Sequence, residues 1–85
     1  YTSDHIFDYI EIDESHAIFE VEVPENWIGK TVGELDIRRK FGINILGVKR
    51  SGKTDVSITS DTVLSKEITI LALGEYKALQ KCFRI

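Results

Sequence analysis

Apolar and polar residues alternate along the first quarter of the chain in the way that β-strands require. In residues 17–23 every second side chain is apolar and acids lie on the opposite face, which is typical of a strand with one buried face. Residues 7–12 alternate in part, and the polar residues 13–15 separate the two runs. We therefore expect a β-hairpin that ends at Pro24, because proline cannot donate a hydrogen bond to a neighbouring strand.

Residues 31–42 carry the start and stop signals of one short helix. Thr31 is followed three residues later by Glu34, which is the spacing of a capping box, in which hydroxyl and carboxylate each accept a hydrogen bond from a backbone N–H. Gly42 suits the left-handed residue that closes a helix. The apolar face of this helix consists of Val32, Leu35 and Ile37.

The pattern after Gly42 predicts two further strands. Residues 43–48 are apolar on both faces apart from Asn44, as in a central strand that is covered on both sides. A strand, a helix and a strand in this order indicate a βαβ unit with a right-handed crossover. Residues 51–53 form a turn signal, so residues 54–58 are expected to return as an antiparallel strand.

The end of the chain predicts a final strand and a final helix. Residues 60–64 are expected to form a loop or a single helical turn, and residues 67–73 the last strand, which Gly74 breaks. Apolar residues recur at helical spacing in residues 75–83, so we expect a helix packed on the sheet. The residues with this spacing are Tyr76, Leu79 and Phe83.

These elements together predict an α+β fold, a small mixed β-sheet with a βαβ unit, a β-hairpin and a C-terminal helix. The 85 residues suffice for one domain, which we place at residues 6–85, with residues 1–5 as the remnant of a linker. Such a chain buries only about 60–65 % of its unfolded surface, so we expect association with a second copy. The chain begins at Tyr1 and has no methionine, so we expect a piece of a longer protein.

Charge is distributed unevenly along the chain. The net charge is −3, which argues against a nucleic-acid partner held by a broad basic face. Between residues 36 and 53, however, six basic residues accompany a single acid. This cluster is either a solvated face near a helix C-terminus, where cations are favoured, or a site for a small anion.

Residues that could perform catalysis or bind a metal ion are scarce. His5 and His16 are far apart and neither has a companion at the spacing of metal ligands, so we interpret both as exposed histidines. Asp13 and Glu14 fit a solvated turn better than a catalytic carboxylate pair. The glycines form neither of the usual phosphate-binding motifs. We therefore expect neither an enzyme nor a metal site.

The single cysteine and the hydropathy bear on the compartment. Cys82 excludes an intramolecular disulfide, fits a reducing compartment such as the cytoplasm, and is expected to be a buried packing residue. The sequence contains no signal peptide and no apolar run of about 18 residues. We therefore expect no direct membrane insertion.

A longer motif runs through residues 23–50, VPENWIGKTVGELDIRRKFGINILGVKR. It resembles the signature of the RCK C-terminal (TrkA-C) domain, and residues 70–74 (ILALG) resemble the strand ending of that family. The resemblance covers nearly the whole chain, from residue 7 to residue 83. The matching residues are Gly29, Lys30, Thr31, Glu34, Leu35, Ile37, Arg38, Gly42, Ile45, Gly47, Val48 and Arg50.

The resemblance implies a regulatory role. Domains of this family follow a Rossmann-like domain or hang from a membrane transporter, pair as homodimers on the cytosolic face of the membrane, and regulate potassium transport systems such as Trk and Ktr. Several bacterial members bind cyclic di-AMP, a two-fold symmetric dianion, in the groove between two copies. The resemblance therefore implies cyclic di-AMP as ligand, no other cofactor, and a membrane-embedded cation transporter as partner of the full-length protein.

Six residues of the motif are implied in ligand binding. Arg38 would pair with a phosphate, and Asn44 and Asp36 would contact an adenine edge or order the pocket. Apolar surface for the bases would come from Val32, Ile43 and Ile45.

Other interpretations remain open for these residues. Asn44 alternatively satisfies backbone at a sheet edge, and Arg38 alternatively is a surface cation favoured by the helix dipole. The sequence departs from ligand-binding relatives at residues 51–52, where some have a histidine, and at residues 58–61, where many have a proline. The alternative function is a structural dimerisation module of a cation transporter or antiporter without a small-molecule ligand. A third possibility is a sensor of another anion or of a metal ion.

Overall fold

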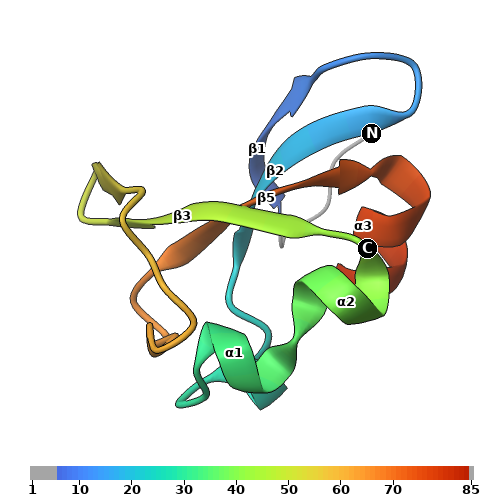
Figure 1. Ribbon diagram of the computed structural model, residues 1–85. Helices are drawn as coiled ribbons and strands as arrows, with labels where there is room; N and C mark the ends of the chain where they lie inside the picture. The colour runs from blue at the N-terminus through green and yellow to red at the C-terminus, as the bar shows by residue number, and fades with distance from the viewer. Residues whose placement is uncertain (1–5, 85) are drawn as a thin grey trace.

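The computed structural model describes residues 6–84, which form one β-sheet with short helices packed against it (Figure 1). The strands are β1 (Ile6–Glu11), β2 (His16–Glu22), β3 (Asn44–Arg50), β4 (Lys53–Asp55) and β5 (Thr69–Glu75). The helices are the 3-10 turn η1 (Glu25–Trp27), α1 (Val32–Leu35), α2 (Ile37–Phe41) and α3 (Tyr76–Phe83).

The strands lie in the order β1-β2-β5-β3-β4, and each neighbouring pair is antiparallel. The expected α+β class is confirmed, with its hairpin, its strand–helix–strand unit and its C-terminal helix. Strands β2 and β3 run parallel to each other because both are antiparallel to β5. They are not neighbours, however, since the last strand inserts between them. The handedness of the crossover stays a prediction.

The centre of the sheet is β5, where we expected residues 43–48. β5 buries every second residue along most of its length. β3 lies between β5 and the short β4, and Leu46 in β3 is 37 % exposed. The expected return strand 54–58 ends at Asp55, because the Asp55 carboxylate accepts a hydrogen bond from the Ser57 backbone at 2.9 Å and turns the chain.

Gly74 does not break the last strand, contrary to the prediction. The strand continues through it to Glu75, and α3 begins at the next residue. A Cβ at Gly74 would lie 3.1 Å from Cγ1 of Ile43. This glycine is therefore explained by the close approach of a buried side chain rather than by a turn.

Both predicted ends of the helical segment are confirmed. The Thr31 hydroxyl accepts from the Glu34 backbone N–H at 3.1 Å, and the Thr31 N–H donates to the Glu34 carboxylate at 3.1 Å. Gly42 closes the segment in the left-handed conformation, with φ 72°.

The segment is two helices rather than the one expected, because Asp36 is left-handed with φ 50°. Leu35 and Ile37 are both buried. In a continuous helix, residues two apart point to different faces, so a break between them is needed to direct both into one core. Aspartate is among the few residues that tolerate this conformation.

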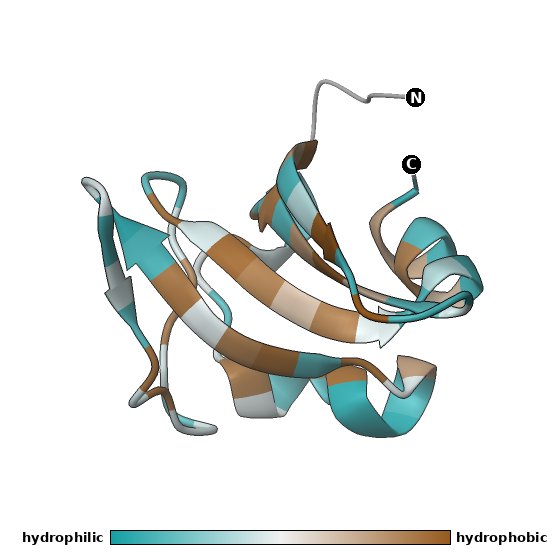
Figure 2. Cartoon of the chain, turned by 90° about the horizontal axis from the view of Figure 1, so that it is seen from above, coloured by the Kyte–Doolittle hydropathy of each residue, from teal (hydrophilic) through white to brown (hydrophobic). Residues whose placement is uncertain are grey.

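The core lies between the sheet and the helices. Figure 2 shows brown, apolar residues concentrated along the middle strands, with teal residues on the outer turns of α2 and α3. The Trp27 and Phe83 rings pack with centroids 5.3 Å apart. The buried core residues are Ala17, Phe19, Val21, Val23, Trp27, Leu35, Ile37, Ile43, Val48, Leu64, Ile68, Ile70, Ala72, Leu79 and Phe83.

Candidate functional site

A groove of about 350 Å³ lies between α1 and α2, the start of β3 and the loop after β4. The left-handed break at Asp36 between α1 and α2, together with the start of β3, brings separate parts of the 23–50 motif together around this groove. All six residues predicted for the ligand site line this groove, namely Val32, Asp36, Arg38, Ile43, Asn44 and Ile45. The remaining lining residues are Gly33, Ile37, Ile58, Thr59 and Ser60.

The apolar part of the groove has both accessible and buried members. Val32 and Ile45 are half-buried and so present surface to the groove, as does Ile58 from the facing loop. Ile43 is fully buried. It supports the wall from within and offers a ligand no side-chain surface.

Among the six predicted residues, two polar side chains are exposed and unpaired within residues 6–84. Arg38 forms no ion pair there, and the Asn44 side chain forms no hydrogen bond. The backbone bond that the alternative interpretation of Asn44 requires is therefore not formed within that range. Arg38 lies in the last turn of α2, where the helix dipole favours a cation. Its position fits both interpretations.

The carboxylate of Asp36 is already engaged. Its Oδ2 lies 2.7 Å from Nε of Arg39. Although Asp36 occupies the N-cap position of α2, its side chain makes no capping hydrogen bond there. Asp36 therefore contributes a paired carboxylate to the groove, whereas Arg38 contributes an unpaired cation.

Residues 58–60 form a wall of the groove. They belong to the loop where many ligand-binding relatives have a proline, but they were not among the predicted site residues. The Gly33 N–H donates to the Ser60 carbonyl at 2.8 Å, and the Val32 N–H donates to the Thr62 carbonyl at 3.0 Å. A Cβ at Gly33 would lie 2.9 Å from that Ser60 oxygen. The signal in the sequence was a glycine in the first turn of a helix, where it costs stability unless a close contact requires it.

The basic cluster of residues 36–53 is mostly a solvated face. Arg50 pairs with Glu67 at 3.0 Å, and Lys49 lies 3.8 Å from Glu20. Among the basic residues of the cluster, Arg38 lines the groove and the others do not. The structure thus narrows the candidate anion contact to one side chain.

A larger hollow, of about 750 Å³, lies beside η1 and the end of α3, and none of the six predicted residues lines it. Cys82 lines it and is half-buried, so the expected packing role is partly met. Burial raises the pKa of the Cys82 thiol to about 11. The thiol is therefore protonated at neutral pH and is a poor nucleophile.

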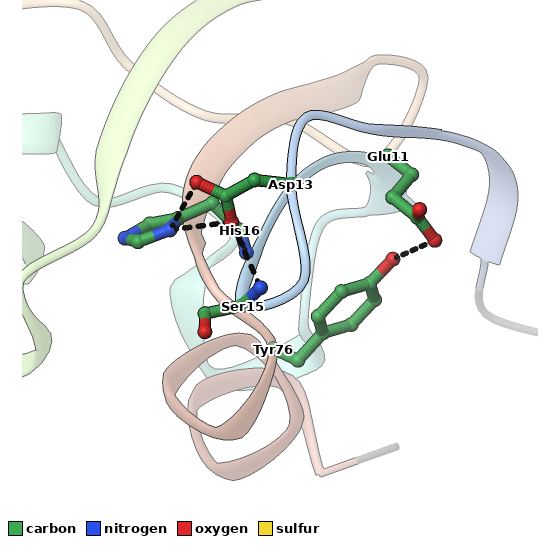
Figure 3. A network of polar contacts seen from close by, with 5 residues as sticks. All are labelled: Glu11, Asp13, Ser15, His16 and Tyr76. Atoms are coloured by element: carbon green, nitrogen blue, oxygen red, sulfur yellow. Dashed lines mark hydrogen bonds and ion pairs between the residues drawn. The ribbon is translucent and has the colours of Figure 1, made fainter.

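The turn between β1 and β2 holds a compact polar network (Figure 3). The Asp13 carboxylate accepts from the backbone N–H groups of Ser15 and His16 at 2.8 Å, and lies 2.9 Å from Nδ1 of His16. The hydrogen bond from His16 holds the pKa of Asp13 below its ordinary value, with the Ser15 N–H contributing. Tyr76 donates to Glu11 at 3.3 Å. Asp13 is thus a turn residue, as predicted. His5 lies outside the described residues.

In residues 6–84 no group of three or more His, Cys, Asp or Glu side chains is arranged to hold a metal ion. No helix in the same range is long and apolar enough to cross a bilayer.

Comparison with known sequences matches residues 17–85 to the TrkA-C domain family, so that β1 precedes the match. The Ktr system potassium uptake protein C of Bacillus subtilis (strain 168) is 35 % identical over 72 residues, which cover 85 % of this chain and 33 % of that protein. The K(+)/H(+) antiporter subunit KhtT of the same organism is 30 % identical over 64 residues, covering 74 % and 39 %. The chain therefore spans about a third of the length of these relatives.

Solved structures show the same fold. The RCK C domain of the potassium transport protein KtrA, in complex with cyclic di-AMP, superposes with a TM-score of 0.75 at 28 % identity and covers 81 % of each chain. The GsuK RCK domain superposes with a TM-score of 0.79 at 26 % identity, covering 94 % of this chain and 18 % of that one.

Proposed function

The chain belongs to the TrkA-C domain family, and on that premise we propose that it is a regulatory domain of a potassium-transport protein that binds cyclic di-AMP between two copies of itself. The observation that carries the proposal is the groove, which gathers all six implied residues and leaves the side chains of two of them, Arg38 and Asn44, unpaired within residues 6–84. A KtrA domain of the same fold was solved with this ligand.

The chemistry of the groove suits one half of such a ligand. The Arg38 guanidinium pairs with a phosphate, and the Asn44 amide can donate to and accept from an adenine edge. Val32 and Ile45, with Ile58 opposite, offer apolar surface to the base. Asp36 orders the groove by fixing the helix junction.

The size of the groove argues for two copies. Its volume of about 350 Å³ lies at the lower end of the range for small-molecule sites, roughly 300–1,000 Å³. A two-fold symmetric dinucleotide is matched by two such grooves facing each other across a dimer axis. We therefore propose a homodimer in which each copy holds half of the ligand.

Regulation follows from differential affinity. A ligand bound between two copies favours one relative arrangement of the copies only to the extent that it binds that arrangement more tightly. In the full-length protein this bias would pass to a membrane-embedded cation transporter, with the domain on the cytosolic side. No catalytic step is part of this proposal.

Isothermal titration calorimetry with cyclic di-AMP tests the proposal, with cyclic di-GMP and ATP as controls. We expect saturation at one cyclic di-AMP per two chains. Arg38→Ala should weaken binding by about 10- to 100-fold, because a hydrogen bond to a charged group is worth about 1.5–3 kcal/mol. Lys40→Ala removes a neighbouring charge outside the groove and should bind like wild type.

A wild-type domain that gives no binding heat with cyclic di-AMP, yet is dimeric by light scattering, would refute ligand binding. That outcome would support a structural dimerisation module instead.

A further inference from the structure

The charges that line the groove cancel. Asp36 and Arg38 are the charged residues among those lining it, so the lining alone would make each half-site neutral. A dianionic ligand gains little net attraction from a neutral site, and a bare Asp36 carboxylate would repel its phosphates. The pairing of Asp36 with a third residue therefore determines the charge that the ligand meets.

That third residue is Arg39, which does not line the groove. Its Nε lies 2.7 Å from Oδ2 of Asp36, and its side chain is 85 % exposed. With the carboxylate neutralised, Arg38 remains as one uncompensated positive charge per copy. Two copies then present two positive charges, which match the two phosphates of a dianion.

The local sequence explains why an acid is present at all. The left-handed break at residue 36 favours Asp, Asn or Gly, and the break is needed to bury Leu35 and Ile37. Asp36 meets this backbone requirement but places a negative charge at an anion site. Arg39, one helical turn further on, offsets that charge.

We propose that Arg39 is a positioning residue that sets the charge of the groove by neutralising Asp36, without itself contacting the ligand. The proposal rests on the proposed cyclic di-AMP function. Exposed ion pairs contribute little to folding stability, so the effect of losing this one should be seen in ligand affinity rather than in thermal stability.

The test is a double-mutant cycle of cyclic di-AMP affinity by calorimetry at low salt. Arg39→Ala should weaken binding about 3- to 10-fold, because it exposes the Asp36 carboxylate to the phosphates. Arg39→Lys, which keeps the charge, should retain most of the affinity. Adding Asp36→Asn to Arg39→Ala should raise affinity above that of Arg39→Ala alone, since it removes the exposed charge and keeps a residue suited to the left-handed break.

Two controls separate the loss of the Arg39–Asp36 ion pair from a general loss of positive charge. One is a change in ionic strength, and the other is the variant Lys40→Ala. The loss in Arg39→Ala should shrink as ionic strength rises toward about 1 M, where the Debye length is roughly 3 Å. Lys40→Ala removes a charge from the same helix and forms no ion pair within residues 6–84. Its affinity should change by less than about twofold. Thermal unfolding by circular dichroism checks that each variant is folded.

The outcomes distinguish the two proposals. Equal weakening in Arg39→Ala and Lys40→Ala, or failure of Asp36→Asn to raise affinity above that of Arg39→Ala alone, would overturn the role of Arg39 and leave cyclic di-AMP binding intact. Absence of binding by the wild-type domain would overturn the proposed function and this inference with it.

Discussion

The hairpin turn and the groove both contain polar groups, but these groups differ in whether they already have hydrogen-bond partners. In the turn, three nitrogen atoms donate to the Asp13 carboxylate, namely the backbone nitrogens of Ser15 and His16 and Nδ1 of the His16 ring. In the groove, the side chains of Arg38 and Asn44 form no hydrogen bond or ion pair within residues 6–84.

This difference separates polar groups that stabilise the local structure from polar groups that are free to bind a ligand. A polar group whose hydrogen bonds are satisfied by its neighbours stabilises local structure and has little left to offer a ligand. An unsatisfied donor beside half-buried apolar surface can still form such bonds, as small-molecule sites require. Sequence position alone does not separate these two cases, since both regions place polar side chains in or beside strands.

The largest effect on folding stability is expected from Gly33→Ala, which disturbs the wall of the groove and the fold together. The new Cβ would lie 2.9 Å from the Ser60 backbone oxygen. Overpacking of this kind costs about 1–3 kcal/mol, partly offset by the gain of about 1 kcal/mol in helix propensity. We expect a melting temperature several degrees lower and weaker cyclic di-AMP binding.

Gly74→Ala is the matched control for that change. Its Cβ would meet Cγ1 of the Ile43 side chain at 3.1 Å rather than a backbone oxygen at 2.9 Å, so a smaller shift relieves the contact and the loss should be smaller. Equal losses of stability in the two variants would contradict the assignment of Ser60 as a fixed wall.

A smaller effect, confined to binding, is expected from Asn44→Ala. Loss of a hydrogen bond to the ligand should weaken affinity by about 0.5–1.5 kcal/mol, or roughly 2- to 13-fold. Thermal stability should not fall, because the side chain has no partner within residues 6–84. Asn26→Ala in the larger hollow is the control and should leave affinity unchanged. Weakened binding in both variants would argue against the groove as the site.

The smallest effect is expected in the turn and should be visible in stability alone. The pKa of Asp13 is lowered in the folded state, so its carboxylate stabilises the fold above the ordinary pKa of 3.8. This contribution is lost as the pH falls through the lowered folded-state pKa. Asp13→Ala should therefore melt below wild type at pH 7, and the difference should shrink as the pH falls below 3.8. Glu14→Ala is the control.

The affinity of Asp13→Ala for cyclic di-AMP shows whether the turn takes part in ligand binding. Asp13→Ala should bind cyclic di-AMP like wild type, because the turn lies outside the groove. A loss of affinity without a loss of stability would show that the turn is part of the ligand site after all.

Local signals in the sequence predicted local structure well. The capping box of Thr31 and Glu34 and the closing Gly42 are where they were expected, because each depends on contacts within a few residues. The polar Asn44 in an apolar strand also pointed to the groove on its own. The other groove residues were identified through the family resemblance rather than through periodicity.

The features that were missed depend on distant contacts. The break at Asp36 arises because Leu35 and Ile37 share a core that includes strands from elsewhere in the chain. The insertion of β5 between β2 and β3 is a choice among strand orders that alternation does not encode. The wall at residues 58–60 depends on a backbone contact with a helix 27 positions earlier.

The most direct test of the central claim is an amide NMR titration of the domain with cyclic di-AMP. The account predicts shifts in the amides of residues 32–38, 43–45 and 58–60, unchanged amides at residues 13–16, and a single set of resonances in the complex, as a two-fold symmetric dimer requires. Shifts centred on the larger hollow around Trp27 and Cys82, or no shifts at saturating ligand, would contradict it.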